Sequence, residues 1–142
     1  MRLRFSLIIS LMLLSGTTNF ADESAAETIG LKRAYGDDAG CYFLKTGTVK
    51  TDSGTFIDKE RVWNYEGGCS FSNVKNITKE FSISTLRNAW NVKMICQSEG
   101  EIYSYDAIIT HNVEHDGLEN VEIIPEGTIS DGSGTERLYP CR

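Results

Sequence analysis

The sequence predicts an all-β protein, a small antiparallel meander or partly closed barrel stapled by two disulfides. Three observations favour this class. Apolar and polar residues alternate with a period of two in several segments, and turn signals recur at intervals of about 8 to 12 residues. The chain of 142 residues also has four cysteines, only two prolines and no long segment with a helical period. We therefore expect short strands joined by tight turns.

The first 21 residues have the pattern of an export signal. Arg2 and Arg4 form a short basic start, residues 5–14 are mainly apolar, and a small polar segment ends at Ala21. The apolar run is shorter than the roughly 20 residues that span a bilayer. We expect cleavage after Ala21 and a periplasmic or secreted protein.

The rest of the chain is long enough for one domain with a single core. We expect an acidic leader over residues 22–40, partly flexible or forming a short helix capped by Asp22 or Ser24, and a single β domain over residues 41–142. Loss of Arg2 and Arg4 leaves 12 basic and 20 acidic residues, a net charge of −8. This balance disfavours nucleic acid and anionic membranes and suits a basic partner. We expect a monomer that does not insert into a membrane.

Strand candidates in the first half are short and separated by turn residues: 41–49, 55–57, 62–65, 69–74 and 81–84. The clearest signal follows in residues 90–96, where every second residue is apolar. Residues 102–110 place alternate aromatic and apolar side chains on one face. Asp116-Gly117 is a hairpin signal, and the last strand candidates are residues 121–124 and 136–139.

All four cysteines remain after signal cleavage: Cys41, Cys69, Cys96 and Cys141. An even number in an oxidising compartment predicts two disulfides with a structural role. Of three connectivities we favour Cys41–Cys69 with Cys96–Cys141, which close loops of about 28 and 45 residues and would each contribute roughly 3.5–4 kcal/mol. The chain has no C-x-x-C pair, and we expect no metal and no cofactor.

Two motifs suggest catalysis. His111 to His115 matches the H-x-x-E-H zinc pattern, but it follows a strand and runs into the Asp116-Gly117 turn, where no helix can hold both histidines on one face. Asp52-Ser53-Gly54 matches the loop of aspartic proteases and is also ordinary turn chemistry. We favour the turn interpretation of both and expect no enzymatic activity, with a small metal-dependent hydrolase at His111 and His115 as the alternative.

The positions of cysteine, glycine and tryptophan resemble those of a group of small exported proteins of alphaproteobacteria. They comprise Cys41, 68–71, Trp90, Cys96, Gly100, Gly117, 131–135 and Cys141. These residue types specify a fold rather than a reaction. The resemblance implies a compact β domain with two disulfides and transfers no catalytic residue.

The combined features predict an exported, non-catalytic binding protein that acts through acidic surface loops. An inhibitor or immunity-type protein for a basic enzyme of the cell envelope fits, and periplasmic lysozyme inhibitors are similar in size, compartment and acidity. The candidate contacts are Glu99, Glu101, Glu114, Asp116 and Asp131. A third hypothesis is a small-ligand carrier whose barrel mouth is lined by aromatic residues, namely Trp63, Tyr65, Trp90, Tyr103 and Tyr105.

Overall fold

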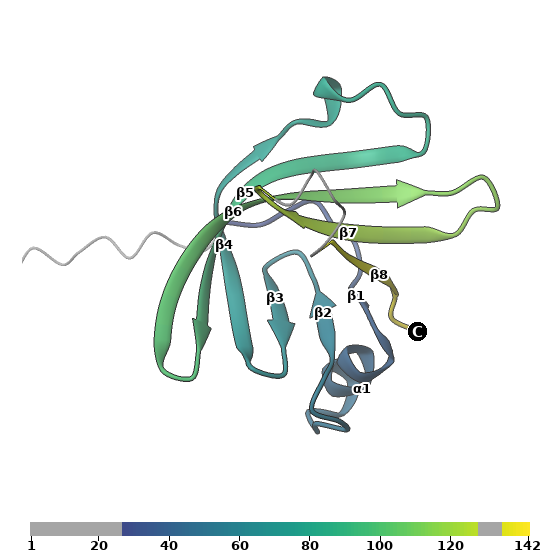
Figure 1. Cartoon of the computed structure of the whole chain (residues 1–142). Coiled ribbons are helices and arrows are strands. Elements are labelled where there is room, and N and C mark those ends of the chain that lie inside the picture. Colours follow the sequence, from purple (N-terminus) through teal and green to yellow (C-terminus); the bar gives the residue numbers. More distant parts are fainter. Residues whose placement is uncertain (1–26, 128–134) are drawn as a thin grey trace, which may run out of the picture.

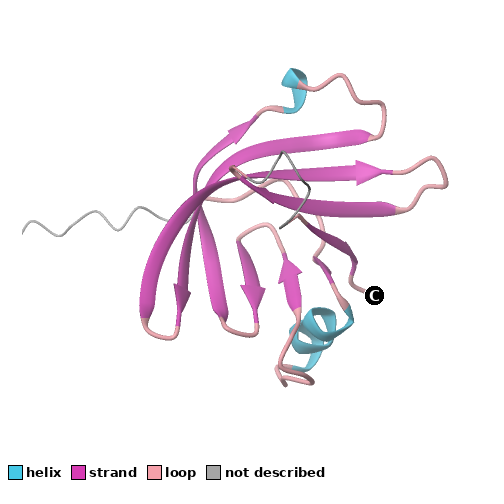
Figure 2. Cartoon of the chain, viewed as in Figure 1, coloured by secondary structure: helices cyan, strands magenta, loops and turns pink. Residues whose placement is uncertain are grey.

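The computed structural model describes residues 27–127 and 135–142, and these form a closed antiparallel barrel of eight strands (Figures 1 and 2). Each strand pairs with the next one in the chain, and β8 pairs with β1. The strands are β1 (Tyr35–Gly36), β2 (Thr55–Ile57), β3 (Arg61–Asn64), β4 (Gly67–Asn76), β5 (Leu86–Ser98), β6 (Glu101–Val113), β7 (Glu119–Pro125) and β8 (Glu136–Pro140). The predicted fold class, with its two disulfides, is confirmed.

The period-two pattern of β5 and β6 places one face of each strand in the barrel core. Met94 lies opposite Tyr105, and Trp90 lies opposite Ile109. Directly opposed residues of an antiparallel pair point to the same face, so these side chains pack together inside the barrel. Trp90, Met94 and Ile109 are all buried.

Residues 29–36 belong to the barrel, although the sequence analysis assigned them to the leader. Ile29, Leu31 and Tyr35 are buried in the hydrophobic core. Tyr35 also begins β1, which closes the barrel between β2 and β8.

A helix occupies the segment for which we predicted the first strand, residues 41–49, and that prediction is wrong. Helix α1 (Asp38–Thr46) begins after Asp37, whose Oδ1 accepts a hydrogen bond from the backbone N of Gly40. It ends at Gly47, which has a left-handed backbone conformation with φ 70°. The ring of Phe43 stacks 3.9 Å from that of Trp63. Helix α1 therefore covers the outer face of β2 and β3.

The predicted strand over residues 81–84 is also wrong. A single 3₁₀ turn, η1 (Thr78–Glu80), precedes it, and the Oγ1 of Thr78 accepts a hydrogen bond from the backbone N of Ala89. Ile77 is buried beside this turn. Residues 81–84 pair with no strand among the described residues, and Ile83 is 56% exposed, so the alternation has no buried face to stabilise a strand.

The disulfides join Cys41 to Cys141 and Cys69 to Cys96, so the pairing that we favoured is wrong. Cys69 and Cys96 lie opposite each other on β4 and β5. Cys41 lies on α1 directly after β1, and β1 pairs with β8, which ends just before Cys141. Barrel closure therefore brings together two cysteines that are 100 residues apart.

The two ends of the barrel carry different segments. We call the end with the β3–β4 turn, the β5–β6 turn and α1 the hairpin end (lower part of Figure 1). The opposite end carries the β2–β3 turn, η1 and the β6–β7 turn. Among the described helices, none has the length and apolar character that crossing a membrane requires.

Candidate binding surface

The acidic residues singled out from the sequence lie at both ends of the barrel. Glu99 and Glu101 are at the β5–β6 turn on the hairpin end, whereas Glu114 and Asp116 are at the β6–β7 turn on the opposite end. Asp131 lies outside the described residues. The structure therefore does not bring the four described residues into one surface.

Glu114 and Asp116 have structural partners. The Oε1 of Glu114 accepts a hydrogen bond of 3.0 Å from Asn120 Nδ2, and Asn120 is a buried residue. The Oδ1 of Asp116 accepts a hydrogen bond from the backbone N of Leu118 within the turn. These two carboxylates stabilise the β6–β7 turn, which lowers their value as contacts for a partner.

Glu99 and Glu101 are exposed, and within the described part of the chain neither forms an ion pair. The β3–β4 turn lies directly beside them because Gly67 pairs with Ser98. The hydroxyl of Ser98 donates a hydrogen bond of 3.0 Å to the backbone O of Glu66, which ties the two turns together. A third exposed carboxylate, that of Glu66, therefore lies near Glu99 and Glu101.

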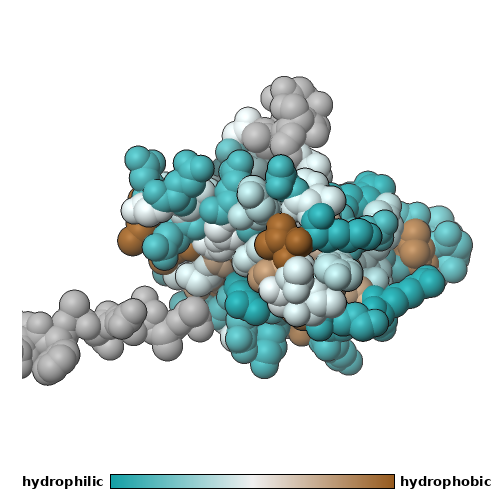
Figure 3. All heavy atoms as spheres, turned by 90° about the horizontal axis from the view of Figure 1, so that it is seen from below, coloured by the Kyte–Doolittle hydropathy of each residue, from teal (hydrophilic) through white to brown (hydrophobic). Residues whose placement is uncertain are grey.

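Exposed apolar side chains lie on the β3–β4 turn and at the start of β6. Ile102 is 74% exposed, and Tyr65 and Tyr103 are about half exposed. The hairpin end in Figure 3 is mainly hydrophilic, with apolar atoms in separate small spots, one of them on the side where the β5–β6 turn projects. We name this surface the acidic hairpin face and define it as Tyr65, Glu66, Glu99, Glu101, Ile102 and Tyr103.

The acidic hairpin face has a rigid base. The buried Cys69–Cys96 disulfide joins β4 and β5 two residues inside the paired Gly67 and Ser98. Gly67 also lies so close to the backbone O of Gln97 that a β-carbon at this position would overlap it. A backbone that is already rigid loses little further conformational entropy on binding, which favours recognition.

A shallow groove of about 340 Å³ extends from this surface along the outer face of β3, β4 and β5. Its apolar lining includes Trp63, Ile95 and Ile102, and Gly68 leaves room between them. The sequence analysis missed Glu66, Ile102 and this groove. The available signal was the position of Ile102, an apolar residue on the polar side of an alternating strand and directly after a turn.

The opposite end contains a polar cluster around the buried Tyr35. The hydroxyl of Tyr35 donates a hydrogen bond of 2.8 Å to Glu119 Oε2 and lies 3.1 Å from His111 Nε2. Arg33 lies 3.6 Å from the same carboxylate. Burial, with a contribution from Glu119, raises the pKa of Tyr35 above its usual value. Burial also lowers the pKa of His111, and the hydrogen bond from Tyr35 lowers that of Glu119.

This cluster does not assemble the predicted zinc pattern. His111 faces Tyr35, Glu114 contacts Asn120, and His115 is exposed in the turn. The residues leave the end of a strand rather than lying on one face of a helix, as a zinc site of this kind requires. Among the described residues, no group of three or more histidines, cysteines or acidic residues could hold a metal ion.

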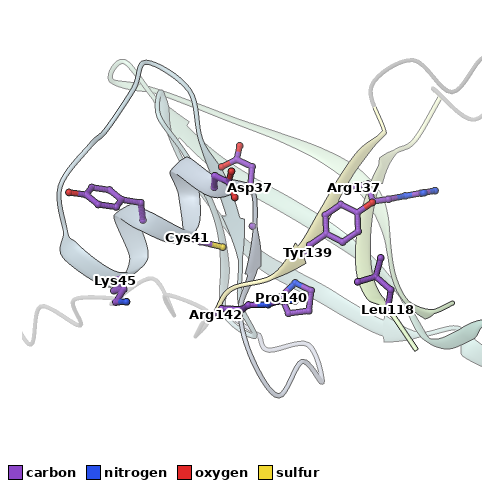
Figure 4. A pocket seen from close by; sticks show the side chains of 11 residues that line it. Asp37, Cys41, Lys45, Leu118, Arg137, Tyr139, Pro140 and Arg142 are labelled. Atoms are coloured by element: carbon purple, nitrogen blue, oxygen red, sulfur yellow. The ribbon is translucent and has the colours of Figure 1, made fainter. Parts of the chain in front are cut away.

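A second groove, about 790 Å³, lies between α1 and β8 beside the Cys41–Cys141 disulfide (Figure 4). The charged side chains that line this groove are both acidic and basic, and some of them form hydrogen bonds with residues outside it. Asp37 accepts hydrogen bonds at the start of α1, and Arg137 Nε donates one of 2.7 Å to Glu122 on β7. The lining therefore offers no convergent set of polar groups for one ligand.

The aromatic residues proposed for a barrel mouth do not share one cleft. Trp90 is buried in the core, and Trp63 packs under α1 on the outer face. Tyr103 and Tyr105 stack with ring centroids 6.4 Å apart near the hairpin end, where Tyr65 is on the neighbouring turn.

Comparison with known proteins finds no matching family model, no matching characterised protein and no matching solved structure.

Proposed function

We propose that this chain is an exported, non-catalytic binding protein that recognises a basic partner protein through the acidic hairpin face. One observation carries the proposal. Three carboxylates and three exposed apolar side chains lie on two adjacent turns and on the start of β6, and the two turns are joined by a hydrogen bond and supported by a disulfide.

The composition of this surface suits a protein rather than a small ligand. The acidic hairpin face combines carboxylates with exposed aromatic and aliphatic side chains, and protein interfaces likewise combine polar and apolar groups. The net charge of −8 expected after signal cleavage would attract a basic partner from a distance and speed association. An inhibitor or immunity-type protein for a basic envelope enzyme would have these properties.

Export is part of the proposal. It is supported by the signal pattern of residues 1–21 and by two disulfides, which persist in oxidising compartments. Mass spectrometry of exported protein should find an N-terminus near Asp22. An intact Met1 on that protein would contradict export by signal cleavage.

Capture from an envelope extract tests recognition, with the mature protein as bait. The decisive variant is Glu99→Lys/Glu101→Lys, which reverses two charges on the acidic hairpin face. The matched control is Glu60→Lys/Glu80→Lys, which changes the net charge equally at the opposite end, where both residues form exposed ion pairs of little energetic value.

We expect a basic protein to be captured by the wild type and by the control, and about tenfold less by the hairpin variant. The rate at which this basic protein associates with the wild type should fall as the salt concentration rises from about 0.05 to 0.5 M, because the Debye length shrinks below about 5 Å. Equal capture by both variants, or association that is indifferent to salt, would rule out recognition by this surface.

A further inference from the structure

The first half of β6 has a strand on only one side within the described residues. β5 pairs with β6 from Ser98↔Glu101 onward, but β7 pairs with β6 only up to Ala107↔Pro125. The last bond on the β7 side is donated by Glu126 N to Asp106 O, at 2.9 Å. Figure 1 shows this half of β6 at the outer edge of the sheet, on the far side of β5 from β4. We call residues 101–105 the free edge.

The end of β7 explains why pairing stops there. Pro125 is the last residue of β7, and the bond from Glu126 N to Asp106 O is the last described contact between the two strands. Gly127, with a φ of 93°, then turns the chain. Among the residues that the structure describes, β6 continues beyond this point with β5 as its one paired strand.

Strand alternation indicates which backbone groups face outward. In an antiparallel pair, the N–H and C=O of alternate residues point to the same neighbour. Asp106 accepts from the β7 side, so the N–H and C=O of Ser104 and Ile102 also point to that side. These backbone groups have the spacing needed to bind another extended chain.

Of the devices that normally block strand addition, the free edge has the charge of Glu101 but no lysine, proline or bulge. Natural edge strands carry lysine, proline or a bulge to prevent pairing with another chain. Residues 101–105 read Glu-Ile-Tyr-Ser-Tyr, and their register with β5 is continuous. Four of the five are exposed.

The charge at the free edge selects the kind of chain that fits. Carboxylates lie at both of its ends, Glu99 and Glu101 at the turn and Asp106 and Glu126 where β7 stops. Each face of the strand combines an acid with apolar neighbours. On the outer face Asp106 accompanies Ile102, and on the inner face Glu101 accompanies Tyr103. A second copy of this acidic chain would bring like charges together, whereas a basic segment would not.

We propose that the free edge binds an extended, basic segment of the partner protein, rich in β-branched residues, by strand addition. The inference rests on the proposed function and specifies its mode of recognition. Backbone hydrogen bonds to Ile102 and Ser104 provide affinity, and lysine or arginine beside Glu101 and Asp106 provides selectivity.

Two synthetic peptides of equal length and charge test the mode. One peptide alternates lysine with valine. The other alternates lysine with proline, a residue that has no backbone N–H to donate. We expect the valine peptide to bind at least about tenfold more tightly by calorimetry. We also expect it to slow hydrogen exchange of the Ile102 and Ser104 amides about tenfold or more.

Two variants at position 104 separate the contribution of the backbone N–H to peptide binding from that of the side chain. Ser104→Pro removes an outward N–H without removing a bond to β5, and it should abolish binding of the valine peptide. Ser104→Ala keeps the N–H and should bind within about twofold of the wild type. If Ser104→Pro does not fold, the exchange rates measured on the wild type decide the matter alone.

The outcomes distinguish this inference from the proposed function. Strand addition is overturned if both peptides bind equally well, or if neither binds at millimolar concentration. In that case, capture of a basic protein through Glu99 and Glu101 would still support the proposed function. A concentration-dependent dimer that is lost in Ser104→Pro would make a second copy the occupant and overturn the choice of a basic partner. Loss of both peptide binding and capture removes both proposals.

Discussion

At the scale of single residues, the hydrogen bonds of Tyr35 show how a barrel end accommodates buried polar groups. Tyr35 lies 2% exposed, yet its hydroxyl has Glu119 as acceptor and His111 beside it. A buried polar atom without such partners is costly. Within the described residues, no buried side-chain N or O atom lacks a hydrogen-bond partner.

The pKa shifts in this cluster predict how stability depends on pH. The folded protein holds the pKa of His111 below its ordinary value through burial, so the unfolded chain takes up a proton first as the pH falls below about 6.5. The hydrogen bond from Tyr35 lowers the pKa of Glu119, which adds a second loss of stability below about pH 4.5. We expect the free energy of unfolding, measured in urea, to decrease in both ranges.

Two variants test which residue causes the loss of stability in each pH range. His111→Gln should flatten the decrease between about pH 6.5 and 5, because it removes the group that titrates there. Tyr35→Phe should reduce the decrease below about pH 4.5, because Glu119 loses its hydrogen-bond donor. Curves for both variants that run parallel to the wild type would contradict this account of the cluster.

At the scale of elements, the clearest strand predictions are confirmed where one face of the strand is buried and the other is exposed. Residues 90–96 and 102–110 alternate because β5 and β6 separate the core from solvent, and this pattern is visible in the sequence. The helix α1 was missed although Asp37 and Gly47 mark both of its ends. Its contact with the outer face of β2 and β3 is mainly Phe43 against Trp63 and Phe56, and nine residues are too few for a helical period to stand out in the sequence.

Adjacent glycines in β4 offer a test of the hairpin end. Gly67→Ala should lower the free energy of unfolding by about 2 kcal/mol, because the added methyl group meets the backbone O of Gln97, which cannot move without breaking the β4–β5 pairing. Gly68→Ala is the control, since its β-carbon would lie 3.5 Å from Val62 O, an ordinary contact, and should change stability by less than about 0.5 kcal/mol. Equal effects in chemical denaturation would contradict the close approach.

At the scale of the whole molecule, the candidate surface was only partly predictable. The sequence indicated Glu99 and Glu101, which follow a turn, but it also indicated Glu114 and Asp116. Only the strand order places these two pairs at opposite ends of the barrel. Disulfide pairing was unpredictable for a similar reason, since the proximity of Cys41 and Cys141 depends on closure between β1 and β8.

The two disulfides should differ in their response to reductant. Cys41 and Cys141 are partly exposed, and Cys41 lines the groove between α1 and β8, whereas Cys69 is 9% and Cys96 1% exposed. Reduction requires a thiolate to reach a sulfur atom. Under native conditions a mild dithiol should therefore expose Cys41 and Cys141 to alkylation first, as mapped by mass spectrometry. Earlier labelling of Cys69 and Cys96 would contradict the burial of their disulfide.

The bond between Cys41 and Cys141 also makes the chain a covalent ring. Seven of the eight strands lie between its two half-cystines, and only β1 precedes them. A protease that cuts one exposed turn, such as that at Asp116 and Gly117, opens the ring at a single point and releases no fragment. The nicked molecule gains only the water added by hydrolysis and keeps both halves of its barrel, so in a compartment rich in proteases the same bond that closes the barrel also keeps a damaged copy in one piece.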